Sequence, residues 1–499
     1  MQAELTRRSL LRSALAAGGV LGTGVAPALT AAAPEMQSRA ASPAGSATPI
    51  SRQFARWVAG LRYEDLPPEV VDRARGLTLT ALASALLGSD APAAQQAIRI
   101  VTEDETGATH GSTLLVEGTR ATKAGAAFAN AEMVWGGRKL DTFRMLLHPG
   151  ACIVPCALAA AETEEASGRD FITGLAAGYE ITSRMAAEFI PTVMSRGFHA
   201  GPVFGIFGSA VAAAKIMRLT EDQLTHAIGL CVNLAGGNLE SLSLRESAAA
   251  RNAMLAVALA RQGRTAGERA IEGDAGFYHA YAGNNRGDLT YSFTGDTRAS
   301  LDALTSGLGE SWLFLETLYR NYSTAGYNIA HVAVTAELCE EHGIRYEDVD
   351  RVEAVVNWLE TQYPSPAFPT RREDTAPAAP GRTKYFAAYG VVSGGYPLLP
   401  GTPDPPEVLE LMHRVTIIPS HEMTLFGPRI TIFTKDGRSY TKQATGREFI
   451  WDFDEQARRM REVVPGLPIP PARFEELVAT CRDLDRERLA QRLAELTIA

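Results

Sequence analysis

The sequence has little cysteine, no excess of positive charge and no long apolar run in its body, and each shortage excludes a class of protein. Five cysteines in 499 residues are too few for a disulfide-rich scaffold. The 48 lysines and arginines are outnumbered by 57 aspartates and glutamates, and the net charge is −9. We therefore expect no nucleic acid partner, because a phosphate-binding surface needs a basic excess. No stretch after the N-terminal region is long and apolar enough to span a bilayer.

The N-terminal 33 residues differ in composition from the rest. Arg7 and Arg8 form a twin-arginine pair, a weakly apolar Gly/Ala-rich run follows from Ala14 to Ala28, and small residues end the segment at 31–33. This resembles a twin-arginine (Tat) export signal. We expect residues 1–33 to be removed after export by the Tat translocase, which makes the mature protein periplasmic or secreted, with no membrane contact. A short membrane anchor is the alternative, although glycines dilute the run.

The remaining chain divides into four segments that differ in composition and in their helix or strand patterns. Residues 34–49 have linker composition, 50–318 are patterned as helices, 319–445 carry strand patterns, and 446–499 return to a helical pattern. This order predicts a mainly α fold in which a large all-helical domain carries an inserted, smaller α+β lid domain. The cleft between two such domains is the default location for a small-molecule site.

Local signals mark individual elements. Pro68 suits the first turn of a helix, and Thr220 with Gln223 forms a capping box before an apolar run. Asp436-Gly437 separates two alternating runs, 429–434 and 439–442, which predicts a hairpin.

Motifs for several common chemistries are missing. The sequence contains no phosphate-binding Gly-x-x-x-x-Gly-Lys-Ser/Thr loop, no His-Glu-x-x-His zinc motif and no Gly-x-Ser-x-Gly elbow. We expect no metal site. Cys152 and Cys156 have helical i,i+4 spacing, which allows a metal or redox pair but favours two small core residues. A disulfide between them would be strained at this spacing, so we predict none.

Four polar residues stand in apolar or glycine-rich contexts. His148 and His199 each precede a helix rich in small residues, where histidine can serve as a proton carrier or as a hydrogen-bonded helix start. Tyr389 lies among other aromatics and could donate a proton or only pack. Arg320 lies where the inserted domain begins, and its guanidinium suits a carboxylate as well as a surface ion pair.

Three stretches of the sequence resemble the MmgE/PrpD family, which includes 2-methylcitrate dehydratase and cis-aconitate decarboxylase. They are LDTFRMLLHPG at 140–150, the segment from Arg196-Gly-Phe-His199 to Ala227-Ile-Gly229, and the helix 253–263 followed by Glu272-Gly-x-x-Gly276-Phe277. The resemblance covers nearly all of 50–499. It implies a helical domain with a smaller α+β lid, a homodimer, and activity without a cofactor.

The resemblance also implies site residues. His148 and His199 correspond to the family's active-site histidines, Asp141 and Thr142 to its Asp-Thr pair, and Tyr389 to its lid tyrosine.

Three further positions depart from the family pattern. Arg138 stands where a carboxylate is usual, Arg245 is the cation nearest to a missing lysine, and Arg320 replaces the lysine that begins the lid. Arginine keeps carboxylate affinity but does not exchange protons near neutral pH.

These residues together predict a cofactor-independent lyase, a dehydratase or a decarboxylase, acting on a small di- or tricarboxylic acid. The three arginines would hold the substrate carboxylates, and one histidine would move a proton next to a carboxylate, with Tyr389 or the other histidine as its counterpart. Two alternatives stay open: an epimerase or isomerase of the same family, and an exported carboxylate-binding member without turnover. A buried ion pair between His199 and Asp141 is the purely structural alternative.

Overall fold

The structure is a computed structural model that describes residues 48–108, 110–362 and 380–499. The predicted signal peptide and residues 34–47 of the predicted linker lie outside the described residues. Residues 48–499 form one compact unit.

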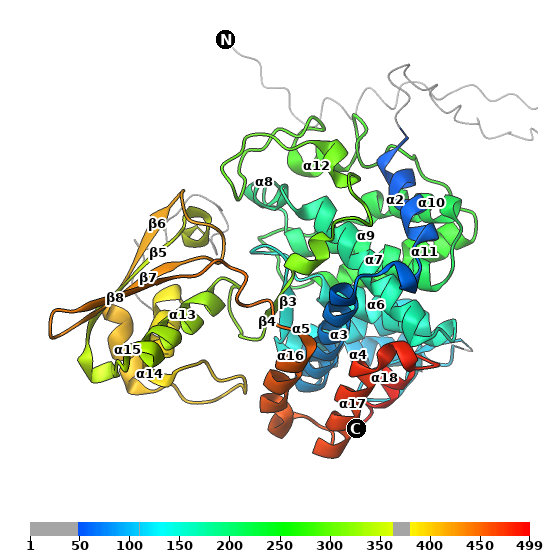
Figure 1. Cartoon of the computed structure of the whole chain (residues 1–499). Helices are drawn as coiled ribbons and strands as arrows, with labels where there is room; N and C mark the ends of the chain where they lie inside the picture. Colours follow the sequence, from blue (N-terminus) through cyan, green and yellow to red (C-terminus); the bar gives the residue numbers. More distant parts are fainter. Residues whose placement is uncertain (1–47, 109, 363–379) are drawn as a thin grey trace, which may run out of the picture. The chain divides into compact units, whose positions relative to one another are not determined.

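Helices dominate the first two-thirds of the unit (Figure 1). They are α2 (Ile50–Gly60), α3 (Pro68–Gly88), α4 (Pro92–Asp104), α5 (Lys123–Gly137), α6 (Gly150–Thr163), α7 (Gly168–Ala186), α8 (Ile190–Ser195), α9 (Ala200–Ile216), α10 (Glu221–Leu234), α11 (Glu246–Arg261) and α12 (Phe277–Ala282). Two predicted starts are confirmed. Pro68 opens α3, and Thr220 and Gln223 cap α10 reciprocally, with N···O distances of 3.0 and 3.3 Å.

Small residues allow the central helices to approach closely. A Cβ built at Gly208 of α9 would clash with the Thr182 side chain and the Gly178 carbonyl of α7. The contact between α7 and α9 therefore depends on glycine, and α6 and α11 also pack on α9. Cys152 and Cys156 are fully buried on α6, in the core positions that their spacing favours.

The helical pattern expected through residue 318 is wrong in several segments, and 283–300 is a long one. Residues 283–300 form irregular turns, and Gly283, Gly287 and Gly295 adopt positive φ values of 82–89°. The reason is local, since this stretch is rich in glycine and asparagine, which favour turns over helix.

A short antiparallel ladder joins two distant parts of the chain. Strand β3 (Leu140–Thr142) pairs with β4 (Leu318–Arg320), and Leu140 lies opposite Arg320. A second small ladder pairs β1 (Ser112–Thr113) with β2 (Arg120–Ala121). The β3–β4 ladder matters for function because it brings Arg320 beside the segment that carries Asp141 and His148.

A four-stranded mixed sheet forms the rest of the predicted α+β segment (Figure 1). Its order is β6 (Val415–Ser420), β5 (Val349–Asn357), β7 (Arg429–Thr434) and β8 (Ser439–Gln443), with β5 and β6 parallel and the other pairs antiparallel. The hairpin predicted at Asp436-Gly437 joins β7 and β8 and is confirmed. Helices α13 (Asn328–His342) and α14 (Thr383–Ser393) pack on the sheet, and α15 (Pro406–Leu411) packs on α14. The mainly α fold with a small α+β part is thus confirmed.

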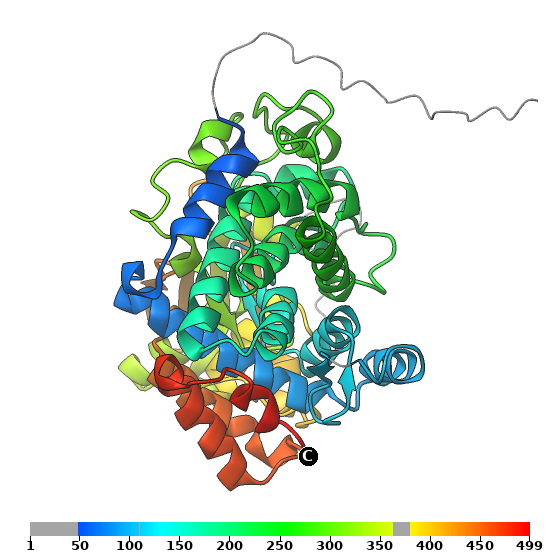
Figure 2. The ribbon, with the colours of Figure 1, turned by 90° about the vertical axis from the view of Figure 1, so that its right-hand side faces the viewer.

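The chain ends in helices that return to the first part of the unit. They are α16 (Phe453–Met460), α17 (Pro471–Arg482) and α18 (Arg492–Glu495). Figure 2 shows them in red beside α3 in blue, and both α16 and α17 contact α3. Asp452 caps α16 by accepting a hydrogen bond from the Glu455 N–H at 2.9 Å.

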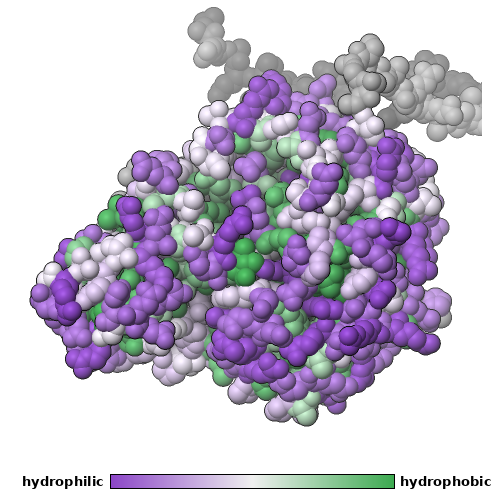
Figure 3. Space-filling view, in the orientation of Figure 1, coloured by the Kyte–Doolittle hydropathy of each residue, from purple (hydrophilic) through white to green (hydrophobic). Residues whose placement is uncertain are grey.

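The face of the unit seen in Figure 3 is covered mainly by hydrophilic residues, with hydrophobic ones in small groups between them. The residues that the structure describes include no helix of the length and apolar character that a bilayer span requires.

Candidate active site

His148 lies on the loop between β3 and α6, and its backbone surroundings determine its tautomer. Its ring Nδ1 lies 2.6 Å from the backbone oxygen of Asp141. A carbonyl oxygen only accepts hydrogen bonds, so Nδ1 carries the proton and Nε2 is the free lone pair of the neutral ring. Burial, reinforced by Arg320, holds the pKa of His148 well below its usual range. The ring is therefore neutral near pH 7, with a base at Nε2.

His199 is the residue that precedes α9, where its backbone N–H donates to the Gly237 carbonyl at 3.2 Å. Its side chain is 7% exposed, and within the described residues its Nδ1 has no hydrogen-bond partner. Burial, with a smaller contribution from Arg245, lowers the pKa of His199 to about 4. This ring is also neutral near pH 7.

The Asp141 carboxylate is buried and is held by neutral donors. Its Oδ2 accepts hydrogen bonds from the Tyr179 hydroxyl at 2.6 Å and the Gly150 N–H at 2.9 Å. Burial raises the pKa of Asp141 to about 6 in spite of these bonds. The ion pair with His199 that the sequence left open is wrong, because among the described residues Asp141 forms no ion pair.

Thr142 is fully buried, and its hydroxyl donates to the Arg144 carbonyl at 3.1 Å. Its methyl group packs near Gly326. The structure thus turns this predicted substrate-binding hydroxyl toward the protein backbone.

All three predicted arginines line one cavity of about 540 Å3, which we call the arginine cavity. Its other lining residues include Trp135, Glu132 and Ser323. Arg138, which ends α5 at a positive φ of 58°, donates to the Ser323 hydroxyl at 3.1 Å.

The other two guanidinium groups also bond neutral oxygens. Arg245 donates to the Leu242 carbonyl at 3.0 Å, and Arg320 donates to the Thr324 carbonyl. A hydrogen bond to a neutral oxygen leaves the positive charge of Arg138 and of Arg245 in place, so these two side chains favour an anion in the cavity.

Trp135 connects the arginine cavity to His148. The indole meets the His148 ring edge-on, with centroids 5.6 Å apart, and the Arg245 guanidinium lies 4.6 Å from the indole centroid. The indole Nε1–H donates to Glu246 Oε2 at 2.7 Å. Sequence reasoning missed Trp135 and Glu246. The signals in the sequence were weak. Trp135 stands in an alanine-rich helix, and the charged pair Arg245-Glu246 stands at the start of a second alanine-rich helix.

Lys139 is a third residue that sequence reasoning missed. It is 3% exposed and lines a cavity of about 200 Å3 next to the arginine cavity, which shares Arg138 and Ser323 with it. Burial, followed by the neighbouring charge of Arg320, lowers the pKa of Lys139 to about 8. The chain thus has a titratable cation one residue from a predicted arginine.

Tyr389 lies on α14, and its hydroxyl donates to Asp404 at 3.1 Å, beside Tyr385, which donates to the same oxygen at 2.6 Å. Burial, with Asp404, raises the pKa of Tyr389 to about 12. Asp404 lines the 200 Å3 cavity with Arg138 and Lys139. The structure therefore links Tyr389 to this smaller cavity, through Asp404, and not to either histidine.

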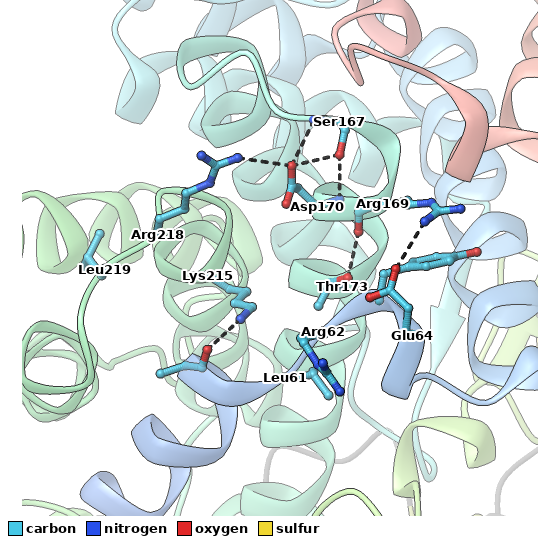
Figure 4. A pocket seen from close by; sticks show the side chains of 12 residues that line it. Leu61, Arg62, Glu64, Ser167, Arg169, Asp170, Thr173, Lys215, Arg218 and Leu219 are labelled. Carbon is cyan, nitrogen blue, oxygen red and sulfur yellow. Dashed lines mark hydrogen bonds and ion pairs between the residues drawn. The ribbon is translucent and has the colours of Figure 1, made fainter.

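A further cavity of about 500 Å3, which we call the paired cavity, lies between the turn at Leu61 and helices α7 and α9 (Figure 4). Its basic residues mostly face carboxylates: Arg169 pairs with Glu64 at 3.2 Å, and Arg218 with Asp170 at 3.6 Å. Lys215 donates to the Ala59 carbonyl at 3.1 Å.

The described part of the chain contains no cluster of three or more histidine, cysteine, aspartate or glutamate residues that could hold a metal ion. All five cysteines are free thiols. Burial raises the pKa of Cys156 to about 12, which makes this thiol a poor nucleophile.

Residues 52–290, which carry both His148 and His199, match the MmgE/PrpD N-terminal domain. Among curated proteins, the chain is similar to a cis-aconitate decarboxylase-like protein of Aspergillus oryzae, 25% identical over 422 residues, which cover 78% of this chain and 84% of that protein. The cis-aconitate decarboxylase of Homo sapiens is 23% identical over 418 residues, 79% of this chain and 82% of the human protein. That of Aspergillus terreus is 24% identical over 293 residues, 56% and 57% of the two chains.

Proposed function

We propose that this protein is a cofactor-independent lyase that decarboxylates or dehydrates a small di- or tricarboxylic acid. The observation that carries the proposal is the convergence of Arg138, Arg245 and Arg320 on one cavity whose wall residue Trp135 contacts His148. The names of the similar proteins support decarboxylation and make cis-aconitate the first substrate to test.

The arginines would bind the substrate carboxylates. Planar guanidinium groups match carboxylates in geometry and keep their charge at every relevant pH. Their field also counters the chain's net charge of −9, which repels an anionic substrate from the protein as a whole.

The histidines would move the protons. In a dehydration, Nε2 of one histidine takes the proton from the carbon next to a carboxylate, the C–H electron pair forms the double bond, and hydroxide leaves with a proton from the second histidine. In a decarboxylation, the C–C bond breaks, its electron pair stays on the substrate carbon, CO2 leaves, and a histidine delivers a proton to that carbon. Both rings are neutral near pH 7, so one can accept a proton directly. The ring that donates its N–H proton takes up another proton from solvent at its second nitrogen, so that it stays neutral.

The test is proton NMR of the purified protein in D2O with cis-aconitate, citrate, 2-methylcitrate, tartrate and malate. We expect the vinyl signal of cis-aconitate to disappear and product signals to grow, with deuterium at the carbon that receives the proton. A His199→Gln variant should abolish the change. Line broadening of an acid without turnover would instead identify a carboxylate-binding protein, and no effect with any acid would overturn the proposed substrate class.

We also propose that the protein is exported through the Tat pathway and acts as a homodimer. The twin arginine at residues 7 and 8 supports export, and the family resemblance supports the dimer. Replacing both arginines with lysine should retain the protein in the cytoplasm on cell fractionation. The mass of the mature protein by light scattering tests the dimer.

A further inference from the structure

Lys139 is a buried cation without an ionic partner among the described residues. It is 3% exposed, its backbone N–H donates to Ser84, and its ammonium group forms no hydrogen bond or ion pair with any described residue. Burying a charge without a partner costs free energy, so buried cations in proteins are normally paired. A bound anion would supply the partner that the described part of the chain does not.

The backbone around Lys139 is fixed on both sides. The N–H of Lys139 donates to Ser84 Oγ of α3 at 2.9 Å, and the next residue, Leu140, begins the β3–β4 ladder opposite Arg320. The preceding residue, Arg138, ends α5 in the left-handed region. Because three successive residues are held by fixed elements, the burial of Lys139 is a property of the fold.

The side chain of Lys139 lines the cavity of about 200 Å3, which we call the lysine cavity. Nζ of Lys139 is not one of the fully enclosed nitrogen atoms without a partner, so this atom lies against accessible space. Lys139 also lines a space of about 10 Å3 beside Asp141, which holds at most a water molecule. The lysine cavity is therefore the space in which a ligand group can reach Lys139.

The lysine cavity adjoins the arginine cavity. Arg138 and Ser323 line both cavities, and the Arg138 guanidinium donates to the Ser323 hydroxyl at 3.1 Å. An acid held by Arg245 and Arg320 in the arginine cavity can therefore extend an arm past Arg138 toward Lys139.

The groups around Lys139 determine its charge. The charged and titratable groups that face it are Arg138, Asp141, Tyr179, Arg320, Tyr396, Asp404 and Glu462. No carboxylate among these described residues forms an ion pair with Lys139, and Asp404 accepts hydrogen bonds from two tyrosine hydroxyls. Burial, followed by the charges of Arg320 and Arg138, lowers the pKa of Lys139 to about 8. The lysine is thus mainly charged at pH 7 and mainly neutral at pH 9.

We propose that Lys139 and Arg138 form a carboxylate subsite in the lysine cavity, and that this subsite selects acids with one carboxylate more than the arginine cavity alone holds. Ammonium and guanidinium groups both donate charge-assisted hydrogen bonds to carboxylate oxygens. A dicarboxylate uses the arginine cavity alone, whereas a tricarboxylate uses both cavities. The inference rests on the proposed function, because it adds a subsite for the same substrate.

Two non-reacting acids test the subsite without turnover. Tricarballylate and glutarate differ only in the central carboxylate, and isothermal titration calorimetry gives the dissociation constant of each. We expect the wild type to prefer tricarballylate at pH 7. Lys139→Met should weaken tricarballylate binding by about 10- to 100-fold, the effect of losing a charge-assisted hydrogen bond, and should leave glutarate binding within about twofold.

The titration of Lys139 provides a second readout. The preference of the wild type for tricarballylate should fall between pH 7 and pH 9, because Lys139 loses its proton, and Lys139→Met should lack this fall. A bound carboxylate stabilises the charged ammonium group. Tricarballylate binding at pH 8 should therefore take up about half a proton more in the wild type than in Lys139→Met. Calorimetry in two buffers of different ionisation enthalpy measures the uptake.

Lys215→Met is the matched control, since Lys215 is a partly buried lysine of the paired cavity that donates to the Ala59 carbonyl. It should leave both dissociation constants and the proton uptake unchanged. Lys139→Met removes an unpaired buried charge, so it should unfold at no lower urea concentration than the wild type.

Equal weakening of both acids in Lys139→Met, or an unchanged affinity for both, would overturn the subsite. If the wild type also converts cis-aconitate, the lyase function stands without the subsite. Loss of the tricarballylate preference in Lys139→Met, in a protein whose wild type shows no turnover, would support the subsite and overturn the lyase function alone.

Discussion

The arginine cavity and the paired cavity are both lined by basic side chains, but these side chains have different partners. In the paired cavity, Arg169 and Arg218 face the carboxylates of Glu64 and Asp170 (Figure 4). In the arginine cavity, the guanidinium groups of Arg138 and Arg245 donate to neutral oxygens. An ion pair cancels most of the field that an anion would feel, whereas a bond to a neutral oxygen leaves it.

The difference teaches that counting basic residues does not locate an anion site. What distinguishes the arginine cavity is that Arg138 and Arg245 donate to neutral oxygens, and that its wall residue Trp135 contacts the neutral ring of His148. The cavity also has a carboxyl group of its own, Glu132, which is buried and accepts a hydrogen bond from Ser247; burial raises the pKa of Glu132.

Replacing His148 should have the largest effect. His148→Gln removes the acceptor at Nε2, so we expect kcat with cis-aconitate to fall on the order of 10²–10⁴-fold, the usual contribution of a positioned acid or base. Lys215→Met, in the paired cavity, should stay within about twofold of the wild type. Rates followed by NMR check both. An equal fall in kcat in His148→Gln and Lys215→Met would contradict the functional distinction between the two cavities.

The next effect concerns stability rather than turnover, and it probes the buried carboxyl group of Asp141. Its pKa is about 6 in the folded protein against an ordinary 3.8, so the native state holds this proton more tightly. The resulting stabilisation is fully present below about pH 3.8 and is lost as pH rises to about 6. At 1.36 kcal/mol per pKa unit, the loss is about 3 kcal/mol.

Asp141→Asn cannot ionise and should lack this part of the pH dependence. Urea unfolding at pH 3.5 and pH 7 measures it. The free energy of unfolding of the variant, relative to the wild type, should rise by about 3 kcal/mol between the two pH values. An identical pH dependence in both proteins would show that Asp141 is not held protonated by burial.

Removing one arginine from the arginine cavity should weaken substrate binding without abolishing chemistry. Arg320→Met and Arg245→Met each remove a charged donor worth about 1.5–3 kcal/mol, which corresponds to a rise in Kd of about 10- to 100-fold. Calorimetric titration with a non-reacting tricarboxylate checks this. Arg169→Gln, from the paired cavity, serves as the control with unchanged Kd. A similar loss in the control would indicate that both cavities bind anions.

The smallest effect is expected from the ion pairs of the paired cavity. The side chains of Arg169 and Glu64 are 54% and 63% exposed, and solvent screens such pairs. Arg169→Gln should lower the free energy of unfolding by no more than about 1 kcal/mol, and 0.5 M salt should shrink the difference. Urea unfolding measures both. A loss above about 2 kcal/mol would mean that this pair organises the helices around it.

Elements with local signals could be predicted from the sequence, and elements without them could not. The capping box at Thr220 and the turn at Asp436-Gly437 depend on interactions within a few residues, so the local sequence is enough to predict both. Residues 283–300 were wrongly expected to be helical because the broad helical pattern around them outweighed their glycines.

For the candidate site, the sequence named individual residues but not their arrangement. His148, His199 and the three arginines were named, yet nothing in the sequence shows that Tyr389 bonds Asp404 or that Thr142 turns inward. Glu246 was missed because the sequence does not distinguish a buried glutamate from an exposed one. What sets it apart is its full burial and the hydrogen bond that it accepts from Trp135.

The sequence by itself determined the mainly α architecture and the presence of a smaller α+β part with its hairpin, since these depend on periodicity and turn chemistry. Only the tertiary structure decided which charges meet. The β3–β4 ladder brings Arg320 beside Asp141, and the packing of α5 against α11 lets Trp135 reach Glu246. Proton affinity and field strength depend on burial and on distance through space, and the chain sets these only when segments far apart in sequence come together.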